Sequence, residues 1–172
     1  MSFSALEVAL EKHSSHPALR EIYNPTLLAR SSRLEADIAY LLGVPEDNWR
    51  YHPVHLKLRD QDLPGISNYI SRIQELANGN TSHSQEAQPE RLLAHAYVRY
   101  LGDLSGGQQI RRNIVKAYQL EDADGAGTTF YAFSKLGGGT QDATIGDMKK
   151  IKDWFREGMN NGAGDDERVK GP

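Results

Sequence analysis

The chain has 172 residues, a formal net charge of -3, no cysteine and a mean hydropathy of -0.61. This length suffices for one domain with a hydrophobic core, and the charge excludes the overall basic footprint of nucleic-acid-binding proteins. The lack of cysteine excludes disulfides, thiolate metal ligands and cysteine nucleophiles, and no apolar run approaches the roughly 18 residues that span a bilayer. We therefore expect a soluble, cytoplasmic protein with no membrane anchor in this chain.

The first half of the sequence predicts helices separated by turns. Residues 3–13 carry leucines at helical spacing. A second helix is predicted from Pro25, with Asn24 as its N-cap, and it continues to Gly43, which suits the position after a helix. Residues 46–64 contain several polar residues and prolines and are predicted to form a loop.

The second half of the sequence repeats this pattern. Residues 65–78 predict an amphipathic helix, Pro89 opens another, and Asp147 is predicted to cap the last one. Residues 161–172 are polar and are predicted to be a disordered tail. No strand pattern competes, so we expect an all-α fold. The apolar stripe predicted for the helix over 65–78 consists of Ile66, Ile70, Ile73 and Leu76.

An unusual cluster of glycines interrupts the helix that begins at Pro89. Gly102, Gly106 and Gly107 lie together, although glycine in a helix interior costs about 1 kcal/mol relative to alanine. One interpretation is close packing of another helix. The other is a flat, bulky ligand that lies directly on the backbone, because residues at i and i+4 share one face.

Two charged residues accompany these glycines. Arg99 and Asp103 stand four residues apart, so they could form an ordinary exposed ion pair worth about 0.3 kcal/mol. Alternatively, Asp103 could hold an ordered water beside a reacting centre. The residues alone leave both interpretations open.

The string AHAYVRYLGDLSGGQ, residues 94–108, closely resembles the signature of the heme oxygenase family. It is long and unusual, so the match is specific. The resemblance covers most of the chain and implies a multi-helical, heme oxygenase-like domain over residues 1–160. Other segments that resemble the family are ALE at 5–7, IYNP at 22–25, LEADIAYLLG at 34–43, the aromatic run 130–133, and the last helix.

The resemblance implies a reaction as well as a fold. Heme oxygenases use heme as both substrate and prosthetic group, and they cleave it with O2 to biliverdin, Fe2+ and carbon monoxide. Their electrons come from a reductase, so the implied partner is an NADPH-dependent reductase. On this basis the chain is expected to be a biliverdin-producing oxidoreductase.

The family's site residues carry over onto matching positions of this sequence. Gly102 and Gly106 would contact the heme face, Asp103 would organise the water that delivers protons, and Arg99 would belong to the same polar network. The residues that would meet the heme propionates are Tyr97, Lys152 and Arg156. For the two cations among them, the alternative is an ordinary solvated helix face with no ligand.

The resemblance also implies a departure from the family. The iron-ligating histidine of the family lies on a helix that precedes the matching segment, so we expect an incomplete domain without that helix and predict no metal ligand in this chain. His95 lies within the signature and is interpreted as structural. None of the remaining histidines matches the ligand position: His13, His16, His52, His55 and His83.

Three alternatives remain at this point. A heme-binding or regulatory protein without turnover would agree with the absent ligand helix. A diiron oxygenase of related helical fold would need Glu-x-x-His pairs, and none occurs here. A helical interaction module without cofactor would give no reason to keep the glycines and Asp103 together.

Overall fold

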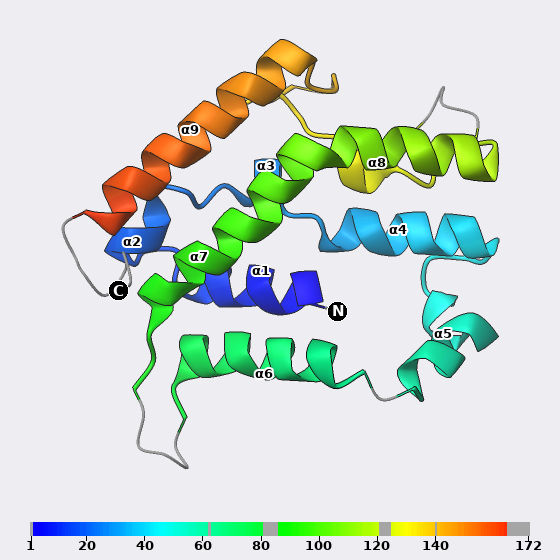
Figure 1. The fold of residues 1–172 in the computed structure, drawn as a ribbon, viewed down its shortest axis with the longest axis horizontal. Helices are drawn as coiled ribbons and strands as arrows, with labels where there is room; N and C mark the ends of the chain where they lie inside the picture. Colours follow the sequence, from blue (N-terminus) through cyan, green and yellow to red (C-terminus); the bar gives the residue numbers. More distant parts are fainter. Residues whose placement is uncertain (1, 62, 81–85, 121–124, 140, 165–172) are drawn as a thin grey trace.

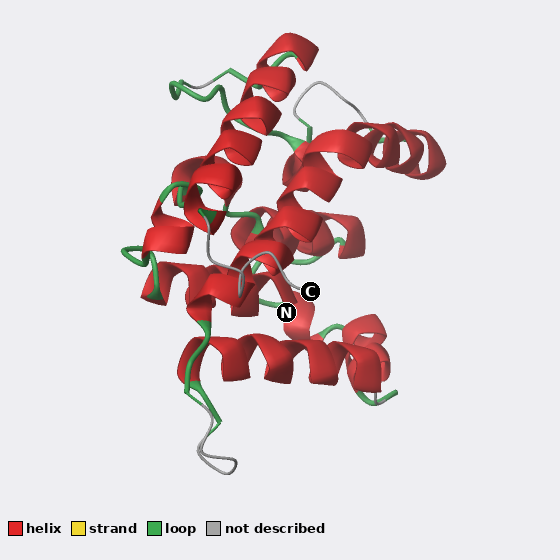
Figure 2. Cartoon of the chain, turned by 60° about the vertical axis from the view of Figure 1, so that its left-hand side comes forward, coloured by secondary structure: helices red, strands yellow, loops and turns green. Residues whose placement is uncertain are grey.

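The computed structural model describes residues 2–61, 63–80, 86–120, 125–139 and 141–164, and these form an all-α fold, as predicted. Helices joined by loops make up this part of the chain (Figure 2), and an isolated antiparallel bridge joins Ser134 and Asp142. The α-helices are α1 (Ser2–Lys12), α2 (Pro17–Arg20), α3 (Pro25–Leu28), α4 (Ser31–Leu42), α5 (Pro53–Arg59), α6 (Pro64–Asn78), α7 (Leu92–Ala96), α8 (Gly102–Tyr118) and α9 (Ile145–Ala163). Shorter helical turns are η1 (Trp49–Tyr51), η3 (Pro89–Arg91), η4 (Tyr97–Leu101) and η5 (Thr129–Tyr131).

α1 and α6 lie side by side (Figure 1), which confirms the helices predicted over 3–13 and 65–78. Ile73 and Leu76 are buried between them and their neighbours. Ile66 at the start of the predicted stripe is 50% exposed, so only the C-terminal part of that stripe enters the core.

The helix predicted from Pro25 to Gly43 is divided into two. Its start is confirmed, since the Asn24 side chain accepts a hydrogen bond from the Leu27 N–H. Its end is also confirmed, because Gly43 has a left-handed φ of 66°. The continuity was wrong: α3 ends at Leu28 and α4 begins at Ser31.

A carboxylate from another helix explains this break. The backbone N–H groups of Arg30 and Ser31 both donate to Oε1 of Glu7 on α1. The first N–H groups of a helix have no intrahelical acceptor, so Glu7 stabilises a new helix start there. Ala29 is extended, which turns the chain between the two helices.

The predicted loop over 46–64 contains two helical elements. His52 ends η1 and is also the N-cap of α5, where its Nδ1 accepts from the Val54 N–H. Pro53 then occupies the first helical position, where its missing N–H costs nothing. The prolines therefore mark helix starts here rather than a loop, which corrects the prediction.

α7, η4 and α8 follow one another and form one rod that bends along its length (Figure 1). η3 precedes this rod, so Pro89 opens the helical run as predicted. The turn Tyr97–Leu101 is π-helical, and such turns inside α-helices are frequent at functional sites. It lies directly before the glycine cluster.

α9 begins with a reciprocal cap. The Thr144 hydroxyl accepts from the Asp147 N–H, and the Asp147 carboxylate accepts from the Thr144 N–H. The N-cap is thus Thr144, and the prediction of Asp147 was wrong by three residues because Asp147 is the partner in a capping box. The helix reaches Ala163, so the first residues of the predicted tail are helical. Residues 165–172 lie outside the described residues.

The helices enclose one hydrophobic core. Burial of each large apolar side chain contributes about 1.5–3 kcal/mol relative to exposure. Among the described helices, none has the length and apolar character needed to cross a membrane. The largest fully buried apolar side chains are Leu6, Leu19, Ile22, Ile73, Leu92, Phe133, Ile151 and Phe155.

Candidate functional site

The three glycines of α8 lie in two different environments. A Cβ added at Gly102 or Gly106 would meet nothing within 4 Å, and both residues are exposed. A Cβ at Gly107 would lie 2.8 Å from the ring of Tyr131. Packing therefore accounts for Gly107, whereas Gly102 and Gly106 leave an open strip on the helix. We call this strip the open face of α8.

Asp103 lies next to the open face with one oxygen unsatisfied. Its Oδ2 is buried and accepts no hydrogen bond from any described residue. Burial raises the pKa of Asp103 to about 6, and the positive charges of Arg99 and Arg30 oppose this rise. A buried carboxylate without a donor is costly, and this fits a site completed by a water or a ligand.

Arg99 is positioned by aromatic rings. Its guanidinium lies 4.2 Å from the centroid of Phe3 on α1 and 5.4 Å from that of Tyr69 on α6. Cation–π contacts of this kind orient the group. Arg99 is half-buried, so the interpretation of a plain exposed ion pair with Asp103 does not describe this geometry.

His95 packs against the same aromatic residue. Its ring makes an edge contact with Tyr69 at 5.5 Å, and burial together with the charge of Arg72 lowers its pKa. This position between α6 and α7 agrees with the structural role predicted for His95. The ligand role remains untested, and His83 lies outside the described residues.

The other described histidines contact backbone groups. His16 and His52 cap helices, and His13 Nε2 lies 2.7 Å from the Ala77 carbonyl oxygen. His55 Nδ1 lies 2.8 Å from the Arg50 carbonyl oxygen. In the described part of the chain, no group of three His, Cys, Asp or Glu residues is placed to hold a metal ion.

Arg30 was not predicted as a site residue, and it is fully buried close to Asp103, on whose pKa its charge acts. Its guanidinium donates to backbone carbonyls and lies 4.1 Å from the Phe133 centroid. Burial is the main cause that lowers its pKa to about 10. No sequence signal marks it, since it stands among leucines of a predicted helix. The carbonyls that accept from it belong to Leu27, Leu28, Phe130 and Ala132.

Asp37 is a second missed residue that positions the site. Its carboxylate accepts from the backbone N–H groups of Thr129 and Phe130 and from the Thr129 hydroxyl. These bonds hold η5 against α4, and η5 carries Tyr131, whose ring packs on Gly107. Two buried polar side chains, Asp37 and Arg30, thus fix the segment that supports α8.

The predicted propionate contacts come from two elements. Tyr97 lies on η4 and is 46% exposed. Lys152 and Arg156 lie on α9, which contacts η4 where Phe155 meets Tyr100 at 6.1 Å. Arg156 Nη1 lies 3.5 Å from Oδ1 of Asp153 on the same helix. A shared role for these three residues stays a prediction.

Comparisons with known proteins identify the family of this chain. A family model described as heme oxygenase matches residues 1–170. Heme oxygenase 1 of Nostoc is 37% identical over 158 residues, which cover 92% of this chain and 54% of that protein. Heme oxygenase 2 of rabbit (Oryctolagus cuniculus) is 31% identical over 92% of this chain and 42% of its own length. The chain thus spans about half the length of the curated relatives it matches.

Solved structures give the same result. The crystal structure of Synechocystis heme oxygenase-2 in complex with heme and NO matches with a TM-score of 0.73 and 32% identity, over 98% of this chain and 58% of that one. The heme oxygenase of Leptospira interrogans matches with a TM-score of 0.70 and 28% identity, over 98% and 68% of the two chains.

Proposed function

Because the chain belongs to the heme oxygenase family, we propose that the open face of α8 binds heme. The protein then takes part in its O2-dependent cleavage to biliverdin, Fe2+ and carbon monoxide. The observation that carries this proposal is the open strip at Gly102 and Gly106 beside the unsatisfied Oδ2 of Asp103.

The residues present fit such a group. A planar macrocycle needs a face from which no side chain projects, and Gly102 and Gly106 supply one over a full helical turn. Heme, when bound there, supplies the iron at which O2 is activated and the ring carbon that is oxidised. The side chains of the protein would handle protons and orient the bound group.

Asp103 has the properties of a proton-handling group. A carboxyl whose pKa is about 6 exchanges protons near neutral pH, which is the condition for efficient general acid–base chemistry. Its Oδ2 has no donor among the described residues and is therefore available to hold a water. Arg99 faces it as a fixed positive charge and favours its ionised form.

Tyr97, Lys152 and Arg156 are assigned to the two propionates. Two cations four residues apart share one face of α9, which suits two carboxylates. Electrons would come from an NADPH-dependent reductase as a transient partner.

A hemin titration of the 172-residue chain, followed in the Soret region and then with added ascorbate, tests the proposal. Gly106→Leu should weaken heme binding by at least about tenfold, because its side chain covers the open face. Gly65→Leu is the matched control, since Gly65 on α6 is also exposed with nothing within 4 Å of an added Cβ. Equal binding by the two leucine variants would contradict the site.

A second variant separates binding from turnover. Asp103→Asn should bind hemin like the parent chain and form biliverdin at least about a hundredfold more slowly, the usual contribution of a general acid or base. Saturable binding by the parent chain with no bile pigment would instead assign it to heme binding without turnover. Loss of binding in Asp103→Asn would contradict the proton role.

A further inference from the structure

A cavity separate from the open face lies between α1 and the connection from α2 to α3. Its volume is about 180 Å³, and Leu10, Ile22 and Leu28 form much of its apolar wall. An apolar cavity of about 150 Å³ in a protein core accepts benzene. The size therefore suits one six-membered ring with a short substituent.

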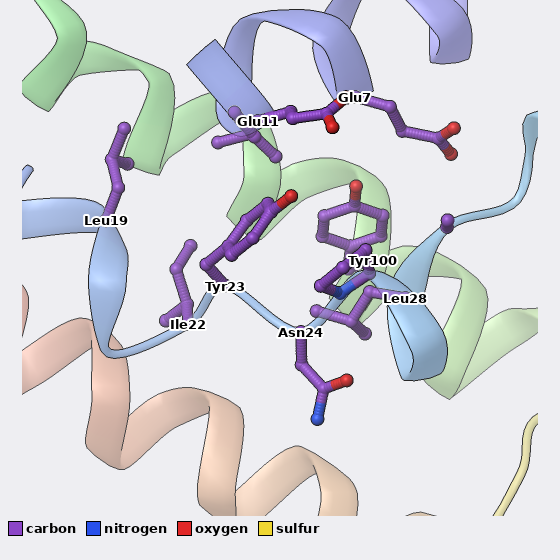
Figure 3. Close-up of a pocket in the computed structure, with 11 residues that line it drawn as sticks. Glu7, Glu11, Leu19, Ile22, Tyr23, Asn24, Leu28 and Tyr100 are labelled. Atoms are coloured by element: carbon purple, nitrogen blue, oxygen red, sulfur yellow. The ribbon is translucent and has the colours of Figure 1, made fainter. Parts of the chain in front are cut away.

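Polar groups converge on one side of this cavity. In Figure 3 the rings of Tyr23 and Tyr100 stand next to each other, and both hydroxyls point toward the α1 side, where Glu7 and Glu11 lie. Two carboxylates and two hydroxyls thus face an otherwise apolar space. This is the arrangement typical of ligand sites, in which apolar walls surround a few oriented polar groups.

Tyr100 is a buried polar side chain without a partner. It is 3% exposed and lines the cavity, and its hydroxyl forms no hydrogen bond with any described residue. Burial and the charge of Glu7 raise its pKa, so the hydroxyl stays protonated at neutral pH. The side chain as a whole is buried, and a hydroxyl that has no partner in the protein and faces the cavity is available to a ligand.

The two carboxylates at the cavity form no ion pair within the described chain. Glu7 Oε1 accepts from two backbone N–H groups, and Glu11 is exposed. The buried Arg30 donates to backbone carbonyls, and its positive charge acts on Glu7 without an ion pair between them. Lys12, next to Glu11, donates to the Ala77 carbonyl and to Asn78 at the end of α6.

We propose that this cavity binds a compact primary amine with an aromatic or cyclic aliphatic body. The ammonium group lies between Glu7, Glu11 and the two tyrosine hydroxyls, and the ring lies against Leu10, Ile22 and Leu28. A cation is selected because the bound ligand displaces water from Glu7 and Glu11, and only a positive charge replaces the lost hydration of two carboxylates. The residues that line this cavity do not include Gly102, Asp103 or Gly106 of the proposed heme site.

Benzylamine is the test ligand and benzyl alcohol is its neutral counterpart of the same size. Titration of the 172-residue chain, followed by amide chemical shifts in NMR spectra, should give saturable binding of benzylamine with a Kd of about 1 mM, a usual value for so small a ligand. The shifted amides should belong to residues 7–11, 22–29 and 100. Benzyl alcohol should bind at least about tenfold more weakly.

Two conservative variants test the polar side of the cavity. Glu11→Gln changes an exposed residue and should weaken benzylamine about threefold to tenfold, while Tyr100→Phe, which keeps the ring, should do the same. Glu157→Gln on the exposed face of α9 is the matched control and should have no effect. The proposal would be overturned if benzylamine and benzyl alcohol bound equally well, or if Glu11→Gln left benzylamine binding unchanged. It would also be overturned if the chemical-shift changes spread over other acidic surfaces.

Discussion

Two helices of this protein carry a pair of glycines at the same spacing, with opposite surroundings. Gly102 and Gly106 on α8, the open pair, have nothing within 4 Å of an added Cβ. Gly158 and Gly162 on α9, the closed pair, would place a Cβ against carbonyl oxygens of the α2 region. The spacing i, i+4 therefore marks only a face without side chains. The neighbouring element decides whether that face is a packing surface or a binding surface.

The closed pair shows what helix packing demands of glycine. A Cβ at Gly158 would lie 2.6 Å from the Glu21 carbonyl oxygen, and one at Gly162 would lie closer still to the Ala18 carbonyl oxygen. Backbone atoms cannot give way as side chains do. α9 and α2 thus approach each other by direct backbone contact, while nothing in the described chain approaches the open pair.

The largest effect is expected in the closed pair. Gly158→Ala and Gly162→Ala should each lower the free energy of unfolding by about 2–3 kcal/mol, because α9 must move away from α2. Urea denaturation followed by circular dichroism at 222 nm measures this change. An unchanged midpoint in both variants would show that α9 does not lie as close to α2 as described.

The next effect concerns the charge beside the open pair. The folded-state pKa of Asp103, about 6, lies above its ordinary value of 3.8, so the folded state binds more protons between these values. Protonated Asp103 therefore contributes fully to the stability of the folded state below about pH 4, and this contribution is lost as the pH rises through 6. At pH 7, Asp103→Asn should exceed the parent chain in stability by roughly 1 kcal/mol, a value reduced for solvent screening of the partly exposed group.

The pH dependence of that difference is the sharper test. Urea midpoints of the parent chain and Asp103→Asn should coincide near pH 4 and separate as the pH increases. Other titrating groups cancel in the difference between the two proteins. A constant difference from pH 4 to pH 7 would mean that Asp103 titrates normally, and the role given to its buried oxygen would fail.

Gly107 lies between the two extremes and tests the comparison within one helix. An alanine here must displace the Tyr131 ring, which is a side chain and can yield. We expect a loss of about 1 kcal/mol after the gain in helix propensity is included. Denaturation of Gly107→Ala measures it, and near-ultraviolet circular dichroism reports the moved ring. A stabilised variant would show that Gly107 belongs with the open pair.

Most of the helices could be predicted from the sequence because apolar spacing and helix caps are local patterns. The stripe ending in Leu76 and the cap at Asn24 depend on residues within a few positions of each other. The break before α4 depends on Glu7, more than twenty residues away, and on the buried Arg30. A carboxylate from another helix that caps a chain segment leaves no mark in the segment itself.

The site, too, could be predicted only where its residues lie close together in the sequence. The motif around Gly102 and Asp103 is contiguous, so the resemblance located it. The support from Asp37 and Arg30 was missed, because both act on a segment about a hundred residues later. The difference between the open and closed pairs could not be predicted either, since it depends on α2, which packs against α9 and leaves no mark in the sequence of either glycine-bearing helix.

The smallest effect, and the one of opposite sign, belongs to the open pair. Gly102→Ala and Gly106→Ala should each raise the free energy of unfolding by about 0.5–1 kcal/mol, because alanine loses less conformational entropy and meets no neighbour. Urea denaturation measures the gain, with Gly65→Ala as the control at another exposed helical glycine. A gain in stability would show that folding does not require glycine at either position. A loss of stability in these variants would show that another part of the protein packs on the open face, and this would contradict its role as a ligand site.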